Sequence, residues 1–220
     1  MPKKFPLSYS RVSTFKKCPA QFEALYVNKS VVDLGSDATH YGERVHKSLE
    51  MYGRTGDESE LTRETKKWKN IVDRIKAQGG ERYFEHKMSI DTDCNPCDWF
   101  DEGVWFRGIA DVLAIKGNRA YCGDYKTGKS RYEDAVQLQI FAALVMFTFP
   151  QVDTVCADFL WLVEDRHTRL TFDRVHLNTM WSRLTKQFDN IQEAVDLGVF
   201  VAKPSRLCNW CAAKDICIYK

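Results

Sequence analysis

Residues 123–130 read GDYKTGKS, and two kinds of phosphate chemistry fit this stretch. It matches G-x-x-x-x-G-K-[ST], the pattern of a loop that holds the phosphates of a nucleotide. It also contains Asp124-x-Lys126, a spacing that places a carboxylate and an ammonium on one face of a strand. A carboxylate can bind a divalent cation, and a lysine can stabilise charge on a phosphate that is being cleaved. The two interpretations predict different proteins, a nucleotide hydrolase and a nuclease.

The nucleotide-loop interpretation lacks the surroundings that it needs. Such a loop requires free backbone amides and a helix that begins at its Lys-Ser pair. Asp124 would place a carboxylate beside the phosphates, and Asp158 is the one candidate for a magnesium-binding acid at the end of an apolar strand. We therefore keep the P-loop hydrolase using residues 123–130 as the less favoured alternative.

The Asp-x-Lys interpretation gains support from the strand that precedes it. Residues 104–115 and 119–126 read as two strands of a hairpin, which would place Ile115 opposite Arg119. Asp111 would then lie opposite Gly123 and close to Asp124. Two close carboxylates repel each other unless a cation lies between them, and their oxygen atoms suit Mg²⁺ or Mn²⁺. A salt bridge between Asp124 and Lys126 on the surface is the simpler explanation of the motif.

Two further residues could join this site. Gly42 and His46 lie one turn apart on an expected helix, where the glycine permits close backbone approach and His46 offers a metal ligand. Glu85, on an expected strand, could support the metal or its water. A packing histidine and an exposed strand glutamate are the alternatives.

The hydropathy pattern predicts an α/β fold around one mostly antiparallel sheet. The expected helices cover residues 10–27, 37–53, 58–77, 132–149 and 177–197, and the expected strands cover 82–90, 104–115, 119–126, 154–163 and 168–175, with a loop at 91–103.

Charge and hydropathy limit the class of protein. The net charge of the 220 residues is only +2, but residues 1–30 are basic and residues 85–111 are acidic. This suits a polyanion held over a cation site, although scattered surface charge would look the same. The N-terminus lacks the apolar core of a signal peptide, and the longest apolar run, at 140–149, is too short to span a bilayer. We expect a cytoplasmic protein without a membrane partner.

The eight cysteines indicate metal binding more than disulfides in a reducing compartment. Cys208, Cys211 and Cys217 lie close together in the tail and need a fourth ligand. Cys94 and Cys97 form a second pair in the acidic loop, which could be a competing ligand pair, a half-site shared with another chain, or two loop thiols. We take them as loop thiols. Cys122 and Cys156 fall in strands and are expected in the core.

Several blocks in order resemble a known family. They are LSYSRVSTFKKCPAQFEALY at 7–26, GERVHKSLE at 42–50, FRGIADVLAI at 106–115, GDYKTGK at 123–129 and QLQIFAAL at 137–144. Together they resemble the RecB-type nuclease branch of the PD-(D/E)XK superfamily, including the iron–sulfur nucleases of CRISPR adaptation and the AddB nuclease domain. The resemblance implies a restriction-endonuclease-like core, a central mixed sheet flanked by helices, that hydrolyses DNA with a divalent metal.

The resemblance also implies roles for single residues. His46, Asp111 and Asp124 would bind Mg²⁺ or Mn²⁺, and Lys126 would be the catalytic lysine. The glutamine that the family carries on the helix after the Asp-x-Lys strand corresponds to Gln137.

Elsewhere the match is less complete. The family's usual tyrosine four residues after that glutamine is Phe141 here. Ser8, Ser10 and Arg11 match the N-terminal block and would contact nucleic-acid phosphate, whereas Ser8 or Ser10 could equally cap a helix.

For the tail, the resemblance supplies Cys18 as the fourth ligand of Cys208, Cys211 and Cys217. A 4Fe–4S cluster, or less favourably zinc, would then join the N- and C-terminal segments, 1–35 and 201–220, of a single nuclease domain with its core at about 36–200.

The leading expectation is an exonuclease for single-stranded or end-containing DNA in recombination, repair or DNA processing. It would act in the cytoplasm (the host cytoplasm if the protein is viral), with any helicase or recombination partner on another chain. A non-catalytic DNA-binding module of the same fold is the second hypothesis.

Overall fold

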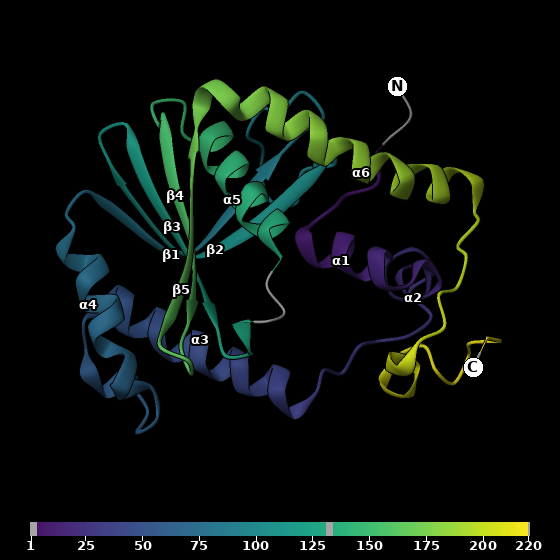
Figure 1. The fold of residues 1–220 in the computed structure, drawn as a ribbon, viewed down its shortest axis with the longest axis horizontal. Coiled ribbons are helices and arrows are strands. Elements are labelled where there is room, and N and C mark those ends of the chain that lie inside the picture. The colour runs from purple at the N-terminus through teal and green to yellow at the C-terminus, as the bar shows by residue number, and fades with distance from the viewer. Residues whose placement is uncertain (1–3, 131–133, 220) are drawn as a thin grey trace.

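The computed structural model describes residues 4–130 and 134–219. Its sheet has the order β1-β2-β3-β4-β5, in which β3 and β4 are parallel and the other neighbours are antiparallel. The strands are β1 (Glu81–Ile90), β2 (Phe106–Lys116), β3 (Arg119–Lys126), β4 (Thr154–Trp161) and β5 (Arg166–Asp173). The predicted α/β class with a mixed sheet is confirmed (Figure 1).

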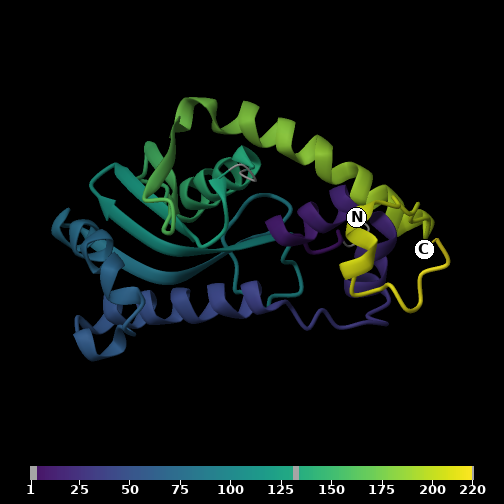
Figure 2. The same ribbon diagram turned by 60° about the horizontal axis from the view of Figure 1, so that its bottom comes forward.

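Helices cover both faces of this sheet. They are α1 (Tyr9–Lys17), α2 (Pro19–Phe22), α3 (Asp37–Thr55), α4 (Lys69–Ala77), α5 (Ala135–Thr148) and α6 (Leu177–Leu197), with a π-helical turn at Glu23–Val27 and 3₁₀ turns at Glu58–Glu60, Thr65–Trp68, Arg174–His176 and Arg206–Trp210. Figure 2 shows α3 along one face of the sheet and α5 and α6 on the other. The sheet is thus the middle layer.

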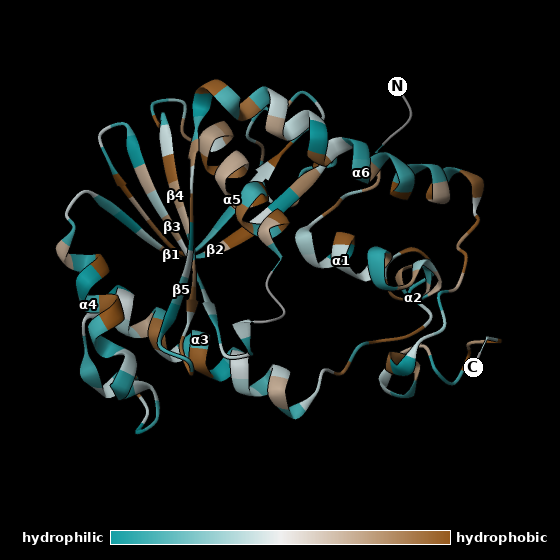
Figure 3. Ribbon diagram, in the orientation of Figure 1, coloured by the Kyte–Doolittle hydropathy of each residue, from teal (hydrophilic) through white to brown (hydrophobic). Residues whose placement is uncertain are grey.

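Helix α5 forms the centre of the larger hydrophobic core. Residues on most of its sides are buried, from Leu138 to Met146, and its ribbon is mainly hydrophobic in Figure 3. A helix that is apolar all round must be buried on all sides, and here the sheet covers one side while Trp181 and Phe188 of α6 belong to the same core. A second core lies between the sheet and α3 and α4 and contains Val45 and Leu49.

The helix expected at 10–27 is interrupted at Cys18. This residue is extended, with φ −160° and ψ 111°, and Pro19 opens the next helix. Proline disfavours helical backbone at the residue before it, and it provides no amide to continue the helix. The helix expected at 58–77 is likewise divided, and only Lys69–Ala77 is α-helical.

The β2–β3 hairpin differs by one residue from the predicted register. Lys116 pairs with Arg119 and Ile115 with Ala120, so two residues rather than three form the turn. Gly117 has φ +59°, which a glycine adopts without strain. Val112 rather than Asp111 therefore lies opposite Gly123.

The other predicted elements differ only at their ends. Helix α6 covers the predicted residues 177–197, and β1, β4 and β5 agree within two residues at each end. The helix expected at 132–149 begins at Ala135 in the structure, and residues 132 and 133 lie outside the described part. Within the described ranges, no helix combines the length and apolar character needed to cross a bilayer.

The two terminal segments lie together at one end of the molecule (Figures 1 and 2). The Lys203 amide donates a hydrogen bond to Cys18 Sγ at 3.4 Å, and Lys203 Nζ donates to the Lys16 carbonyl. The position of Cys18 at the helix break therefore brings its thiol to the C-terminal segment.

Candidate active site

Strands β1 and β2 change the direction of their side chains at Glu85 and Asp111. Glu85 has φ +49°, a left-handed conformation inside a strand. On β2, Ala110 belongs to the core that contains α5 and Val112 to the core that contains α3, although regular alternation would put them on one face. This break lets the Asp111 carboxylate face His46 on α3.

The conformation of Glu85 yields a stability prediction. Glu85→Gly and Glu85→Ala both remove the carboxylate, but only glycine accepts a positive φ without a steric cost of about 1 kcal/mol. In EDTA, the Glu85→Gly protein should therefore be about 1 kcal/mol more stable than Glu85→Ala, as measured by urea denaturation. Equal stabilities would show that the backbone at this position is not strained.

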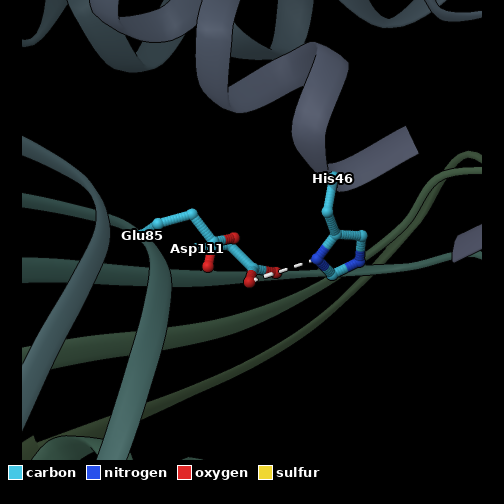
Figure 4. Close-up of side chains that lie close together, drawn as sticks. All are labelled: His46, Glu85 and Asp111. Atoms are coloured by element: carbon cyan, nitrogen blue, oxygen red, sulfur yellow. Dashed lines mark ion pairs between the residues drawn. The ribbon is translucent and has the colours of Figure 1, made fainter. Parts of the chain in front are cut away.

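His46, Glu85 and Asp111 form a cluster of possible metal ligands. One ligand atom from each residue lies within 4.8 Å of the others. Figure 4 shows them converging from α3, β1 and β2, with His46 Nδ1 3.2 Å from Asp111 Oδ1. Burial opposes protonation of His46, but its hydrogen bond to Asp111 and the nearby carboxylates outweigh that effect and raise its pKa to about 9.

Strands β2 and β3 separate where the two aspartates lie. Their last paired residues are Val112 and Gly123. Beyond this pair, Asp111 Oδ2 accepts a hydrogen bond of 2.6 Å from the Tyr125 amide. The Asp111 side chain thus takes the place of the backbone hydrogen bond that would continue the β2–β3 ladder. In turn, the backbone of β3 fixes the Asp111 carboxylate. Sequence patterns cannot reveal this contact, because the donor is a backbone amide.

Asp124, Lys126 and Gln137 form a second group on the α5 side. Gln137 Nε2 donates to Asp124 Oδ1, and Lys126 Nζ donates to Gln137 Oε1, both at 2.9 Å. Lys126 Nζ also lies 2.6 Å from Asp124 Oδ2. This contact is an ion pair, so the Lys126 ammonium already balances part of the charge on that buried oxygen.

The electrostatics of the site favour a bound cation. Burial raises the pKa of Glu85, with a further contribution from the charge of Asp111. Burial also raises the pKa of Asp124; Lys126 opposes this shift and Asp111 adds to it. Asp124 is not a member of the 4.8 Å cluster, but the Glu85 and Asp111 carboxylates within it repel each other as anions unless positive charge compensates them. Their oxygen atoms and one imidazole are a ligand set that fits Mg²⁺ or Mn²⁺.

An open cleft of about 430 Å³ leads to this site. It is lined by Thr39, Gly42, Glu43, His46, Lys47, Glu50, Glu85 and Asp111. A side chain at Gly42 would start 3.2 Å from Thr127 Oγ1, so this glycine allows α3 to approach the end of β3, as the sequence indicated. The cleft gives an extended ligand access to the candidate metal ligands.

The sequence matches the family model of the PD-(D/E)XK nuclease superfamily over residues 6–218. This chain belongs to the PD-(D/E)XK nuclease superfamily. A search of curated proteins finds no significant match.

Two solved structures share the fold of this nuclease. SSO0001 has a TM-score of 0.50 and 15% sequence identity, with 100% of this chain and 89% of that chain covered. A protein from Eubacterium rectale named "Putative exonuclease" has a TM-score of 0.53 and 15% identity, with 99% and 90% covered. At this identity, the likeness shows the fold alone.

The nucleotide-loop interpretation of residues 123–130 is wrong. Gly123–Lys126 lie within β3 and pair with β4, and Asp111 accepts the Tyr125 amide. Among the described residues, the next α-helix after β3 is α5, which begins at Ala135 with Asp134 as its N-cap. The first half of the motif therefore cannot wrap a phosphate.

The predicted phosphate contacts Ser8, Ser10 and Arg11 lie at the start of α1. Ser8 caps this helix by accepting a hydrogen bond from the Arg11 amide, the alternative that the sequence left open. Arg11 is half-buried, donates to the Pro6 carbonyl and lies over the Tyr26 ring. Ser8 and Arg11 thus have structural contacts, and their contact with nucleic acid stays a prediction.

Four cysteines line one cavity of about 790 Å³ between the terminal segments: Cys18, Cys208, Cys211 and Cys217. Burial and the neighbouring thiols raise the pKa of Cys211. Four thiolates on one zinc ion would lie about 3.8 Å apart, because each Zn–S bond is about 2.3 Å long. Among the described residues, no three cysteine sulfurs lie within 4.8 Å of one another, so the spacing is not that of a zinc site.

Proposed function

We propose that this protein is a divalent-metal-dependent DNA nuclease that hydrolyses phosphodiester bonds, acting as an exonuclease on single-stranded or end-containing DNA. The observation that carries the proposal is the convergence of His46, Glu85 and Asp111 within 4.8 Å, beside the Asp124–Gln137–Lys126 network. Superfamily membership and the fold shared with the Eubacterium rectale protein support the nuclease class.

In this proposal His46, Asp111 and Asp124 hold the metal, and Glu85 supports it. The repulsion between the Glu85 and Asp111 carboxylates fits that role, and Asp124 Oδ2, which pairs with Lys126 at 2.6 Å, would share its charge between the lysine and the metal. A bound Mg²⁺ or Mn²⁺ would make water a better nucleophile and reduce the negative charge on the phosphate.

Lys126 and Glu85 have separate roles in the proposed reaction. Gln137 and Asp124 fix the Lys126 ammonium, whose remaining N–H donor can bind a phosphate oxygen as charge develops there. Glu85, a half-buried carboxylate with a raised pKa, can accept the proton that the attacking water loses. The water oxygen forms a bond to phosphorus, and one of the two phosphorus–oxygen bonds to the sugars breaks. The sugar oxygen that is released takes up a proton.

End-labelled single- and double-stranded DNA tests this function. Wild type and Asp124→Ala, purified without oxygen, are each incubated with Mn²⁺, Mg²⁺ or EDTA. Cleavage by wild type with metal only, and none by the variant, is expected, and the product ladder reports the polarity. A folded wild type that binds DNA and cuts neither substrate would refute catalysis and favour the DNA-binding module.

Metal binding should depend on pH. Without metal, His46 is protonated below its pKa of about 9, so a metal ion must displace that proton. Between pH 8 and 7 the apparent Mn²⁺ affinity should fall about tenfold for one displaced proton. Titration calorimetry in two buffers of different ionisation enthalpy measures the proton release. His46→Gln should bind more weakly and with a flatter pH dependence; an unchanged slope would exclude His46 as a ligand.

We also propose that Cys18, Cys208, Cys211 and Cys217 hold a 4Fe–4S cluster, in which each cysteine binds its own iron and the sulfurs lie further apart than on one zinc ion. Amides of Lys203 and Ser205 donate to Cys18 Sγ and Cys208 Sγ, which stabilises thiolate charge. The resemblance to the RecB-type branch, with its iron–sulfur CRISPR-adaptation members and AddB, belongs to the same proposal, as does a separate helicase or recombination partner.

A further inference from the structure

A polar hollow of about 520 Å³ lies beside the candidate active site. It is lined by Gly53, Arg54, Lys76, Arg82, Tyr83, Phe84, Glu85 and His86. The end of α3, the end of α4 and the first half of β1 contribute these residues. The active-site cleft and the hollow share Glu85, so the two spaces are adjacent.

The charge of the hollow is opposite to that of the cleft. Arg54, Lys76 and Arg82 face one space, and within the described residues neither Lys76 nor Arg82 has a carboxylate within 4.0 Å. Arg54 pairs with Glu50 through Nε at 2.8 Å. Glu85 is the acid among the lining residues and is outnumbered by the three cations, which repel one another unless an anion lies between them. When the Arg54–Glu50 pair and Glu85 are both counted, the lining still carries an excess of positive charge.

Backbone contacts already position the two arginines. Arg54 Nη2 donates to the Phe84 carbonyl, and Arg82 Nη1 donates to the Lys76 carbonyl. A guanidinium has five N–H donors, so both arginines retain free donors. Gly53 lets the Phe84 ring lie against α3, because a Cβ there would be 2.3 Å from the ring. An incoming anion would find the arginines largely preorganised.

Helix α3 connects the cleft to the hollow. His46 and Glu50 line the cleft, and Gly53 and Arg54 line the hollow, all on one stripe of the helix. The rise from His46 to Arg54 is about 12 Å along the helix axis. A nucleic-acid strand with one phosphate at the metal ligands can therefore place another phosphate near Arg54.

We propose that Arg54, Lys76 and Arg82 bind one phosphate group of a nucleic-acid strand that has another phosphodiester at the metal site. This inference rests on the proposed nuclease function and adds a substrate-binding subsite to it. A terminal phosphate carries a charge of about −1.5 to −2 at pH 7, so this positive lining attracts it more strongly than it attracts the single charge of an internal phosphodiester. The hollow would then recognise a strand end.

The variant that tests the subsite is Lys76→Gln/Arg82→Gln. Its matched control is Lys66→Gln/Arg74→Gln, which changes two exposed cations of the same types that do not line the hollow. Melting temperatures establish that both proteins fold. Oligonucleotides with a phosphate or a hydroxyl at the 5′ end, and the same pair for the 3′ end, are compared for cleavage with Mn²⁺ and for binding in EDTA by fluorescence anisotropy.

The test variant should bind phosphate-terminated DNA about 10- to 100-fold more weakly than wild type, with a higher KM, while the control pair stays at the wild-type value. For the test variant, the slope of the logarithm of the binding constant against the logarithm of the salt concentration should be shallower by about 1 to 2. Loss confined to substrates with one terminal phosphate identifies that end; equal loss on all substrates overturns recognition of a strand end and identifies an internal phosphodiester instead. Both results support the phosphate subsite.

Two results separate the failure of this inference from that of the proposed function. If wild type cleaves DNA and the test variant matches the control pair in KM and in binding, the hollow is not a phosphate site, and the nuclease function stands. If wild type cleaves nothing but the test variant alone loses DNA binding, catalysis fails while the phosphate site remains.

Discussion

Lys126→Ala should lower kcat for DNA cleavage about 100- to 1,000-fold, the usual effect of removing one donor that stabilises transition-state charge. Lys126 Nζ is fixed by Gln137 Oε1 and Asp124 Oδ2 and lies 4.9 Å from the centre of the Phe159 ring. The ammonium thus has little freedom to move. Single-turnover cleavage of end-labelled DNA with Mn²⁺ measures the effect on the chemical step.

Lys129→Ala is the matched control for this prediction. Lys129 is exposed and belongs to the same GDYKTGKS stretch, where a nucleotide loop would use it as its essential lysine. We expect this variant to cleave DNA at close to the wild-type rate. The reverse outcome, with Lys129 essential and Lys126 dispensable, would contradict the assignment of Asp124 and Lys126 to the site.

Cys18→Ser should produce the largest loss of stability. The proposed cluster closes a loop that contains most of the chain, and a crosslink over such a loop contributes about 5 kcal/mol by restricting the unfolded state. For a protein of this size, that loss corresponds to a fall in melting temperature of roughly 10–20 °C. Thermal unfolding under anaerobic conditions, with iron and sulfide analysis of the same samples, measures both effects.

Cys97→Ser provides the comparison for the cluster. Cys97 is half-buried in the 91–103 loop and does not line the cavity between the termini. Its replacement should leave iron content unchanged and the melting temperature close to that of wild type. Zinc without iron or sulfide in the wild-type protein would refute the iron–sulfur assignment, and iron loss from Cys97→Ser would place the ligands in the acidic loop.

The sequence determined the elements and the short motifs. Side chains two apart on a strand share a face, so Asp124-x-Lys126 could be recognised without knowledge of any other part of the chain. Helical spacing placed Gly42 and His46 on one face of α3, and continuous apolar character predicted the burial of α5. The order of the five sequence blocks along the chain indicated the PD-(D/E)XK superfamily, and the match to its family model confirms this.

Only the tertiary structure decided how these residues meet. Glu85 reaches Asp111 because of its left-handed backbone, and Asp111 is fixed by the Tyr125 amide where β2 and β3 separate. The hollow likewise joins residues from α3, α4 and β1 that share no motif. Sequence periodicity describes regular strands and helices, whereas these contacts arise where regular geometry is broken and distant elements pack together.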